Sequence, residues 1–231
     1  MKWTKPGIKK MKFSRIKLLS VIFACGLTVL SAQAFEVAFN SAETIGARGG
    51  ILSDNPKFIE GGLECRDSGT IVNFCKFPSD GIINPAHGTI EITFKPFWKN
   101  TASKNCLFNT GVGVMWGEAN TMHLQREGDA LNFIIIDEKQ AINVVSAQNF
   151  VSKFDDGKFH QVTASWDTEK GLALYVDGVK EGFTDCRFTM SKISPWIYIG
   201  NNNIYSGGQI YYYPSNAVIK SMRITDAPVS N

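Results

Sequence analysis

The stretch 157–182 constrains the fold more than any other part of the sequence. Apolar residues occupy every second position of 162–166 and again of 172–176, with polar or small residues between them. This alternation is typical of β-strands with one buried and one exposed face. The dipeptide Asp177-Gly178 follows, and it favours the type I′ turn of a tight hairpin. The stretch therefore predicts an antiparallel meander.

Short strand-like segments recur along the rest of the chain. The segment 88–97, GTIEITFKPF, alternates strictly, and the apolar run 134–136 predicts a strand covered on both faces. We place Trp196 in the core because it begins a strand beside two isoleucines, and the glycine-dotted segment 40–55 reads as a loop. No helix of convincing length is predicted. Short strands separated by turn residues indicate a β-sandwich or barrel.

The first 34 residues have the three parts of a secretory signal. A basic leader precedes an apolar run over 18–30, and Ser31-Ala32-Gln33-Ala34 offers a cleavage site before Phe35. The apolar run is shorter than the ~20 residues that span a membrane. We therefore expect a signal peptide over 1–34, one domain over 35–231, and a secreted, periplasmic or cell-surface product.

Cys25 supports an alternative to simple cleavage. The sequence Ile22-Phe23-Ala24-Cys25 loosely resembles a bacterial lipoprotein box, in which this cysteine would carry a lipid anchor. Association with a membrane is expected only through the export signal or this anchor.

Removing the leader reverses the sign of the net charge. The chain has 24 basic and 21 acidic residues, and the leader holds seven of the basic residues and none of the acidic ones. The remainder therefore has 17 basic against 21 acidic residues, a net charge of −4. No basic cluster follows any predicted strand, so the sequence argues against nucleic-acid binding.

Four cysteines remain outside the leader. An even number in an exported chain predicts disulfides, for which three connectivities exist. Closeness in sequence favours pairing Cys65 with Cys75, which leaves Cys106 with Cys186.

The order of several motifs resembles that of a known family. Lys158 to Val162 (KFHQV) is similar to a "W-H-H-V" strand, and Tyr175 to Gly178 (YVDG) matches a "Y-V-D-G" hairpin. Ile199-Gly200 resembles a late "I-G" step, and Met222 to Ile224 resembles a closing "V-R-I" strand. Together they resemble the concanavalin A-like lectin/glucanase superfamily, in particular the laminin G-like (LamG) domains of bacterial secreted proteins. The resemblance implies an all-β, two-sheet antiparallel jelly-roll sandwich. One departure is Lys220-Ser221, where the family usually carries an acidic pair, and this puts any nearby calcium role in doubt.

Catalytic signals are weak. The E-x-D-x-x-E strand of glucanases on this fold is absent, and Glu91 is the lone acid of its strand. His123 shares a strand face with Gln125, so a lyase with His123 as base and a tyrosine as acid is an alternative, but the arginine-rich strand of such lyases is missing.

Carbohydrate binding requires fewer specific residues than catalysis does. Sugar rings stack on Trp or Tyr, while amides reach their hydroxyls. We therefore expect a non-catalytic domain that recognises a glycan or glycoprotein surface, with a glycan-degrading hydrolase or lyase and a protein-interaction or structural module as alternatives. No cofactor is expected, although Asp137 and 201–203 could supply calcium ligands. The expected ligand-binding residues are Trp98, Trp116, Asn201, Asn202, Asn203, Tyr205, Tyr211, Tyr212 and Tyr213.

Overall fold

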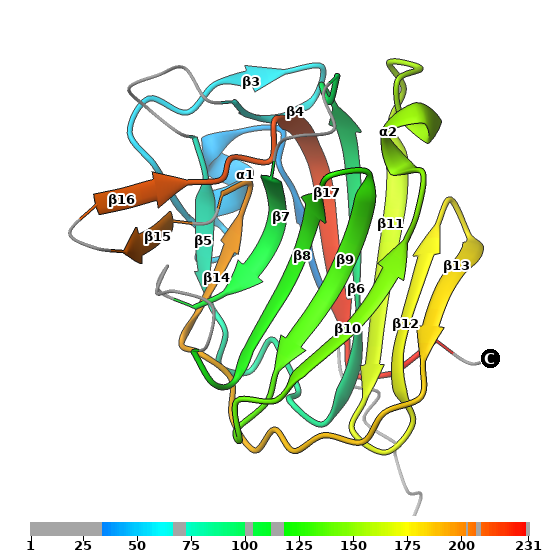
Figure 1. Cartoon of the computed structure of the whole chain (residues 1–231). Helices are drawn as coiled ribbons and strands as arrows, with labels where there is room; N and C mark the ends of the chain where they lie inside the picture. The colour runs from blue at the N-terminus through cyan, green and yellow to red at the C-terminus, as the bar shows by residue number, and fades with distance from the viewer. Residues whose placement is uncertain are drawn as a thin grey trace, which may run out of the picture. The chain divides into compact units, whose positions relative to one another are not determined.

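Strands make up most of the regular structure in the computed structural model of this chain (Figure 1). The structure describes residues 34–66, 73–99, 104–111, 118–201, 203–206 and 209–229, of which 203–206 and 209–212 are described by their backbone alone. Two antiparallel sheets pack against each other around a core of isoleucine, leucine, phenylalanine and valine side chains. The predicted two-sheet antiparallel sandwich is confirmed.

The first sheet is ordered β13-β12-β11-β6-β17-β4-β3, and β1 pairs with β17 beside β4. The N-terminal strand β1 pairs directly with the C-terminal strand β17, which also pairs along its length with β6. The strands are β1 (Phe35–Ala38), β3 (Phe58–Ile59), β4 (Gly62–Cys65), β6 (His87–Pro96), β11 (His160–Asp167), β12 (Gly171–Val176), β13 (Val179–Thr184) and β17 (Ala217–Thr225).

The second sheet is ordered β10-β9-β8-β7-β14-β5-β2. A separate two-stranded hairpin follows β14, and two short helices lie in connections. These elements are β2 (Ile51–Leu52), β5 (Cys75–Pro78), β7 (Lys104–Thr110), β8 (Thr121–Glu127), β9 (Ala130–Ile136), β10 (Ile142–Ala147), β14 (Trp196–Ile199), the hairpin β15 (Asn203–Ser206) and β16 (Gln209–Tyr212), α1 (Ala42–Gly46) and α2 (Phe150–Lys153).

The meander predicted over 157–182 forms β11, β12 and β13. Its alternating apolar residues are buried, and strands β11 and β12 pair from Val162 opposite Val176 to Asp167 opposite Gly171. At the β12–β13 turn, Asp177 has φ 48° and Gly178 has φ 79°. Positive φ at both central residues is the signature of a type I′ turn, so the predicted hairpin is confirmed.

Two predictions about local structure were wrong in detail. Within 40–55 the chain forms α1 and β2, because the Ser41 side chain accepts a hydrogen bond from the Thr44 backbone N–H and so caps the helix. Trp196 does not lie in the core: Ile197 and Ile199 of the same strand are fully buried, and alternation turns Trp196 to the opposite face, where it is partly exposed. The apolar run 134–136 is buried on both faces, as predicted.

His160 fastens the start of β11 to the β12–β13 turn. Its Nδ1 lies 2.8 Å from Asp177 Oδ2, and its Nε2 lies 2.9 Å from Asp156 Oδ1. The other Asp177 oxygen accepts a hydrogen bond from the Gln161 backbone N–H. His160 therefore has a structural role, since it connects the start of β11 to the β12–β13 turn.

The His160–Asp156 hydrogen bond predicts that the stability of the fold depends on pH in acid. The hydrogen bond with His160 lowers the pKa of Asp156 from 3.8 to about 2. A carboxylate whose pKa is lower in the folded state stabilises the fold above its unfolded pKa, and this contribution is lost as the pH falls from about 4 to about 2. We expect His160→Ala to flatten the dependence of the free energy of unfolding on pH in this window, as measured by urea titration. His87→Ala is the matched control, and equal slopes for H160A and the wild-type protein would contradict the assignment.

Candidate functional site

One row of side chains crosses the outer face of the second sheet, the face turned away from the core. Residues directly opposite each other on antiparallel strands point to the same face, and the strand registers align one residue from each of six neighbouring strands. We call this set the Tyr198 row. In order from β10 to β5 it consists of Val144, Ile134, His123, Asn109, Tyr198 and Lys76.

Aromatic rings gather at the β14 and β5 end of the Tyr198 row. Trp196 and Tyr198 are both partly exposed, and the ring centroids of Phe74 and Tyr198 are 6.1 Å apart. Lys76 Nζ lies 4.6 Å from the centroid of the Trp196 ring. Among the described residues, the indole N–H of Trp196 has no hydrogen-bond partner. This end of the row therefore combines flat apolar rings with a free donor.

Tyr198 keeps its phenolic proton at neutral pH. Burial, and then the negative charge of nearby Glu118, raise the pKa of Tyr198 above its ordinary value of 10. A protonated phenol can both donate and accept a hydrogen bond. Tyr198 thus offers a polar group as well as a ring.

The middle of the second sheet's outer face carries His123 and Gln125, which share this face as predicted. Burial lowers the pKa of His123 to about 4, so its imidazole is neutral at neutral pH, and its Nε2 lies 3.1 Å from Thr121 Oγ1. Gln125 is 7% exposed, and its Nε2 has no hydrogen-bond partner. A buried amide left unpaired costs about 1–3 kcal/mol. This amide is therefore a buried donor with no partner among the described residues.

The hairpin β15–β16 is fastened to β7 beside the Tyr198 row. Asn109 Nδ2 donates to the carbonyl of Asn201 at 2.8 Å, just before the hairpin. The Cys106 N–H donates to the carbonyl of Tyr213 at 3.3 Å, just after it. Figure 1 shows the hairpin extending away from the strands of both sheets. The segment singled out from the sequence for glycan binding therefore borders this row.

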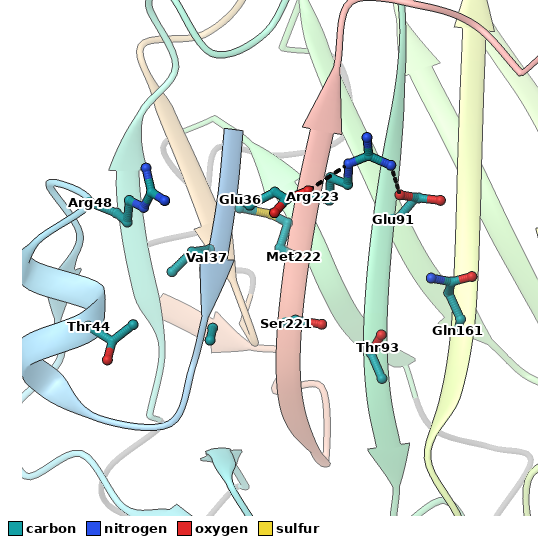
Figure 2. A pocket seen from close by; sticks show the side chains of 11 residues that line it. Glu36, Val37, Thr44, Arg48, Glu91, Thr93, Gln161, Ser221, Met222 and Arg223 are labelled. Carbon is teal, nitrogen blue, oxygen red and sulfur yellow. Dashed lines mark hydrogen bonds and ion pairs between the residues drawn. The ribbon is translucent and has the colours of Figure 1, made fainter. Parts of the chain in front are cut away.

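A polar groove of about 470 Å³ lies on the opposite side of the sandwich, on the outer face of the first sheet (Figure 2). Its lining comes from β1, β17, β6, β11 and α1. Arg223 lies between two acids, with Nε 2.8 Å from Glu36 Oε1 and Nη1 3.3 Å from Glu91 Oε2. The groove has no aromatic residue in its lining, which is Glu36, Val37, Ala38, Thr44, Arg48, Glu91, Thr93, Gln161, Ser221, Met222 and Arg223.

A family model described as the concanavalin A-like lectin/glucanases superfamily, Laminin_G_3, matches residues 72–231. The chain belongs to this superfamily. The match covers more than two thirds of the sequence and includes the strands from β5 to β17, with the whole Tyr198 row. No curated protein sequence matches the chain.

Solved structures with the same concanavalin A-like architecture include toxin domains. The binding domain of botulinum neurotoxin serotype D is 12% identical, with a TM-score of 0.63, and the match covers 86% of this chain and 49% of that chain. The binding domain of botulinum neurotoxin DC, solved in complex with rat synaptotagmin II, is 11% identical, with a TM-score of 0.65 and coverage of 85% and 49%. A third structure concerns botulinum neurotoxin type C, whose cell entry depends on interaction with two ganglioside molecules; it is 11% identical, with a TM-score of 0.63 and coverage of 85% and 48%.

These likenesses establish the fold. The chain spans about half the length of the toxin structures that it matches.

The carboxylates of this concanavalin A-like domain are not arranged for glycoside hydrolysis in the groove. Hydrolysis uses two carboxyl groups on either side of a glycosidic bond, with one of them acting as the acid. Here the guanidinium of Arg223 joins Glu36 to Glu91 and neutralises part of their charge. In the described part of the chain, no group of three or more His, Cys, Asp or Glu residues is placed to hold a metal ion. No described helix is long and apolar enough to cross a membrane.

The expected ligand-binding residues fall into several environments. Trp98 is 3% exposed, and its Nε1 donates to the carbonyl of Ser215 at 2.7 Å, so it belongs to the core and not to a binding surface. Asn201 is buried, and Tyr213 is half-buried. Trp116 and Asn202 lie outside the described residues. The backbone alone is described for Asn203, Tyr205, Tyr211 and Tyr212, which lie on the two strands of the hairpin.

The other predicted ligand set concerns calcium. Asp137 Oδ1 accepts hydrogen bonds from the backbone N–H groups of Lys139 and Ala141, at 2.9 and 2.8 Å. This carboxylate organises the turn between β9 and β10, so at least one of its oxygens already serves the backbone.

The predicted disulfides are absent, and all four cysteines are free thiols. Cys65 and Cys75 lie on opposite sheets and are close enough for Cys75 to contribute to the raised pKa of Cys65, yet each is a free thiol. Cys186 follows β13, and β13 packs against β10, where Thr184 donates a hydrogen bond to the carbonyl of Val144. Cys106 lies on β7, which is three strands away from β10 in the second sheet. Cys186, just past β13, is therefore too far from Cys106.

The buried thiols should be unreactive in the folded protein. Burial raises the pKa of Cys75 and of Cys106 to about 12, and it raises the pKa of Cys65 still further. We expect iodoacetamide at pH 8 to label Cys186, which is partly exposed, and to leave the other three unlabelled until urea is added. Mass spectrometry without reductant checks this. If any of these cysteines reacts only after reduction, the assignment of all four as free thiols is contradicted.

Proposed function

We propose that this protein is an exported, non-catalytic binding domain that recognises carbohydrate through the outer face of its second sheet. The observation that carries the proposal is the partly exposed Trp196, whose indole N–H has no partner among the described residues, beside the partly exposed Tyr198. Sugar rings present apolar C–H faces that stack on such rings, and their hydroxyls need nearby donors and acceptors.

The polar groups of this face suit a hydroxylated ligand. The phenol of Tyr198 can donate and accept a hydrogen bond, whereas the amide of Gln125 is buried and Nε2 of His123 already bonds to Thr121. Lys76 Nζ lies 4.6 Å from the centroid of the Trp196 ring, so a donor stands beside the ring.

Two further facts support recognition over catalysis. The fold is shared with toxin domains that bind receptors, one of them solved with synaptotagmin II and another tied to gangliosides. In addition, the glutamates of the sheet-face groove are joined through one arginine and are not set out as an acid and a base. The secretory signal expected over 1–34 supports recognition outside the cytoplasm.

A glycan array probed with the purified protein tests the proposal. We expect binding to a limited set of glycans, and we expect Trp196→Ala to lose it. A parallel array with chelator decides whether calcium contributes through the oxygen ligands that 201–203 could supply. No glycan signal at high protein concentration would overturn the proposal.

A further inference from the structure

The groove on the outer face of the first sheet has one end that is internally paired and one that is not. At the paired end, Arg223 bonds to Glu36 and Glu91. The side chains of Thr93, Gln161, Ser221 and Arg48, which come from both sides of the groove, make no hydrogen bond or ion pair with any described residue. In Figure 2, Glu36 reaches toward Arg223, while Arg48 lies on the other side of β1.

The strand registers bring the neutral groups together. Thr93 of β6 is directly opposite Gln161 of β11 and Ser221 of β17, so the three side chains form a short row on one face. Two hydroxyls and an amide in a row can bond to successive hydroxyls of one sugar. The apolar members of the lining, Val37 and Met222, are themselves buried in the core, so an apolar ligand would find little surface here.

Charge decides which sugar would bind. Neutral hydroxyls that exchange water for protein gain little net free energy, and this groove has no ring on which a sugar could stack. Arg48 is exposed and unpaired, and a guanidinium forms strong paired hydrogen bonds with a carboxylate or sulfate. An anionic group on the ligand would therefore supply the affinity that the hydroxyls alone lack.

A second unpaired cation lies near the same row. Lys220 belongs to the irregularity in β17 between Ile219 and Ser221, and its Nζ lies 5.1 Å from the ring centroid of Phe159, two residues before Gln161. It makes no ion pair with any described residue. Lys220 is thus next to Ser221 of the neutral row, and Arg48 lies across β1 from it (Figure 2), while Glu36, Arg223 and Glu91 form the neighbouring row.

We propose that this groove is a second ligand site, which takes an anionic saccharide with its acidic group on Arg48 and its hydroxyls on Thr93, Ser221 and Gln161. The site shares no residue with the Tyr198 row and does not depend on the proposed function of that row. Uronic acid carboxylates and sulfate esters share the chemistry that Arg48 recognises.

The test is a calorimetric titration of the purified protein with three probes: a galacturonate trisaccharide, its methyl ester, and a sulfated galactose trisaccharide. We expect binding of at least one anionic probe and none of the methyl ester, and comparing the two anions tells carboxylate from sulfate recognition. Arg48→Ala should weaken binding about 10-fold, the loss of a charge-assisted hydrogen bond. Arg187→Ala, which removes an exposed arginine elsewhere, is the matched control and should leave affinity unchanged.

A second variant should change the affinity in the opposite direction. Glu91→Gln removes a repulsive charge from the groove and should strengthen binding of the anionic probe about 2- to 4-fold at low salt. A misfolded variant cannot produce a gain of this kind. Failure of both anionic probes to bind, equal affinity for the methyl ester, or an unchanged affinity in R48A would each overturn the proposal. Because Trp196→Ala should not alter this titration, its outcome is separate from that of the glycan array.

Discussion

Replacing Trp166 by alanine should lower the free energy of unfolding by about 3–5 kcal/mol, as expected for removing a large buried aromatic side chain. Trp166 is 1% exposed, its ring packs near Phe133, and its Nε1 donates to the carbonyl of Asn84 at 3.1 Å. Gly88, directly opposite on β6, makes room for the ring, since a Cβ at that position would lie 2.5 Å from it. The substitution therefore leaves a cavity and an unpaired carbonyl.

Urea unfolding of the purified protein measures this effect. The matched control is the same substitution on the sheet surface, Trp196→Ala, for which we expect a loss of about 1 kcal/mol or less because the side chain is partly exposed. Similar losses for the two variants would contradict the assignment of Trp166 to the core and of Trp196 to the outer face.

Replacing Trp196 by alanine should instead weaken glycan binding, by about 10- to 100-fold. A stacked aromatic side chain at the centre of a binding surface typically contributes about 1.5–3 kcal/mol of affinity. The variant keeps the fold, because the buried residues Ile197 and Ile199 of the same strand are unchanged. Titration with a glycan selected on the array measures the loss.

Phe183→Ala is the control for this titration. Phe183 is a large aromatic side chain, 48% exposed, on β13 at the edge of the other sheet. Its removal should leave glycan affinity unchanged. An equal loss in F183A and W196A would mean that general surface hydrophobicity, and not the Tyr198 row, governs binding.

The fold was predictable because local patterns agree with the tertiary structure. Alternation over 162–166 and 172–176 gives the buried faces of β11 and β12, and Asp177-Gly178 supplies the positive φ of the hairpin. What the sequence could not convey is how strands far apart in the chain pair. The disulfide prediction was wrong: closeness in sequence paired Cys65 with Cys75, but both are free thiols, and they lie on different sheets.

The candidate site was harder to predict than the fold. The Tyr198 row takes its residues from six strands that are scattered between residues 75 and 199, and only their registers show that they share a face. One signal was available in the sequence: Trp196 and Tyr198 alternate with two isoleucines, so one of the pairs had to face outward. Trp98 shows the converse, since a tryptophan just past a strand end proved to be core, held by the Ser215 carbonyl.

The indole N–H resonances of the tryptophans test the central claim most directly. The chain has five tryptophans, and the indoles of Trp98 and Trp166 donate to backbone carbonyls, whereas that of Trp196 has no described partner. The resonance of Trp196 is assigned by its absence from W196A. On titration with a glycan selected on the array, we expect this resonance to shift in proportion to occupancy while those of Trp98 and Trp166 stay in place. Saturation of the protein with glycan while the Trp196 resonance remains unmoved would contradict recognition through this face.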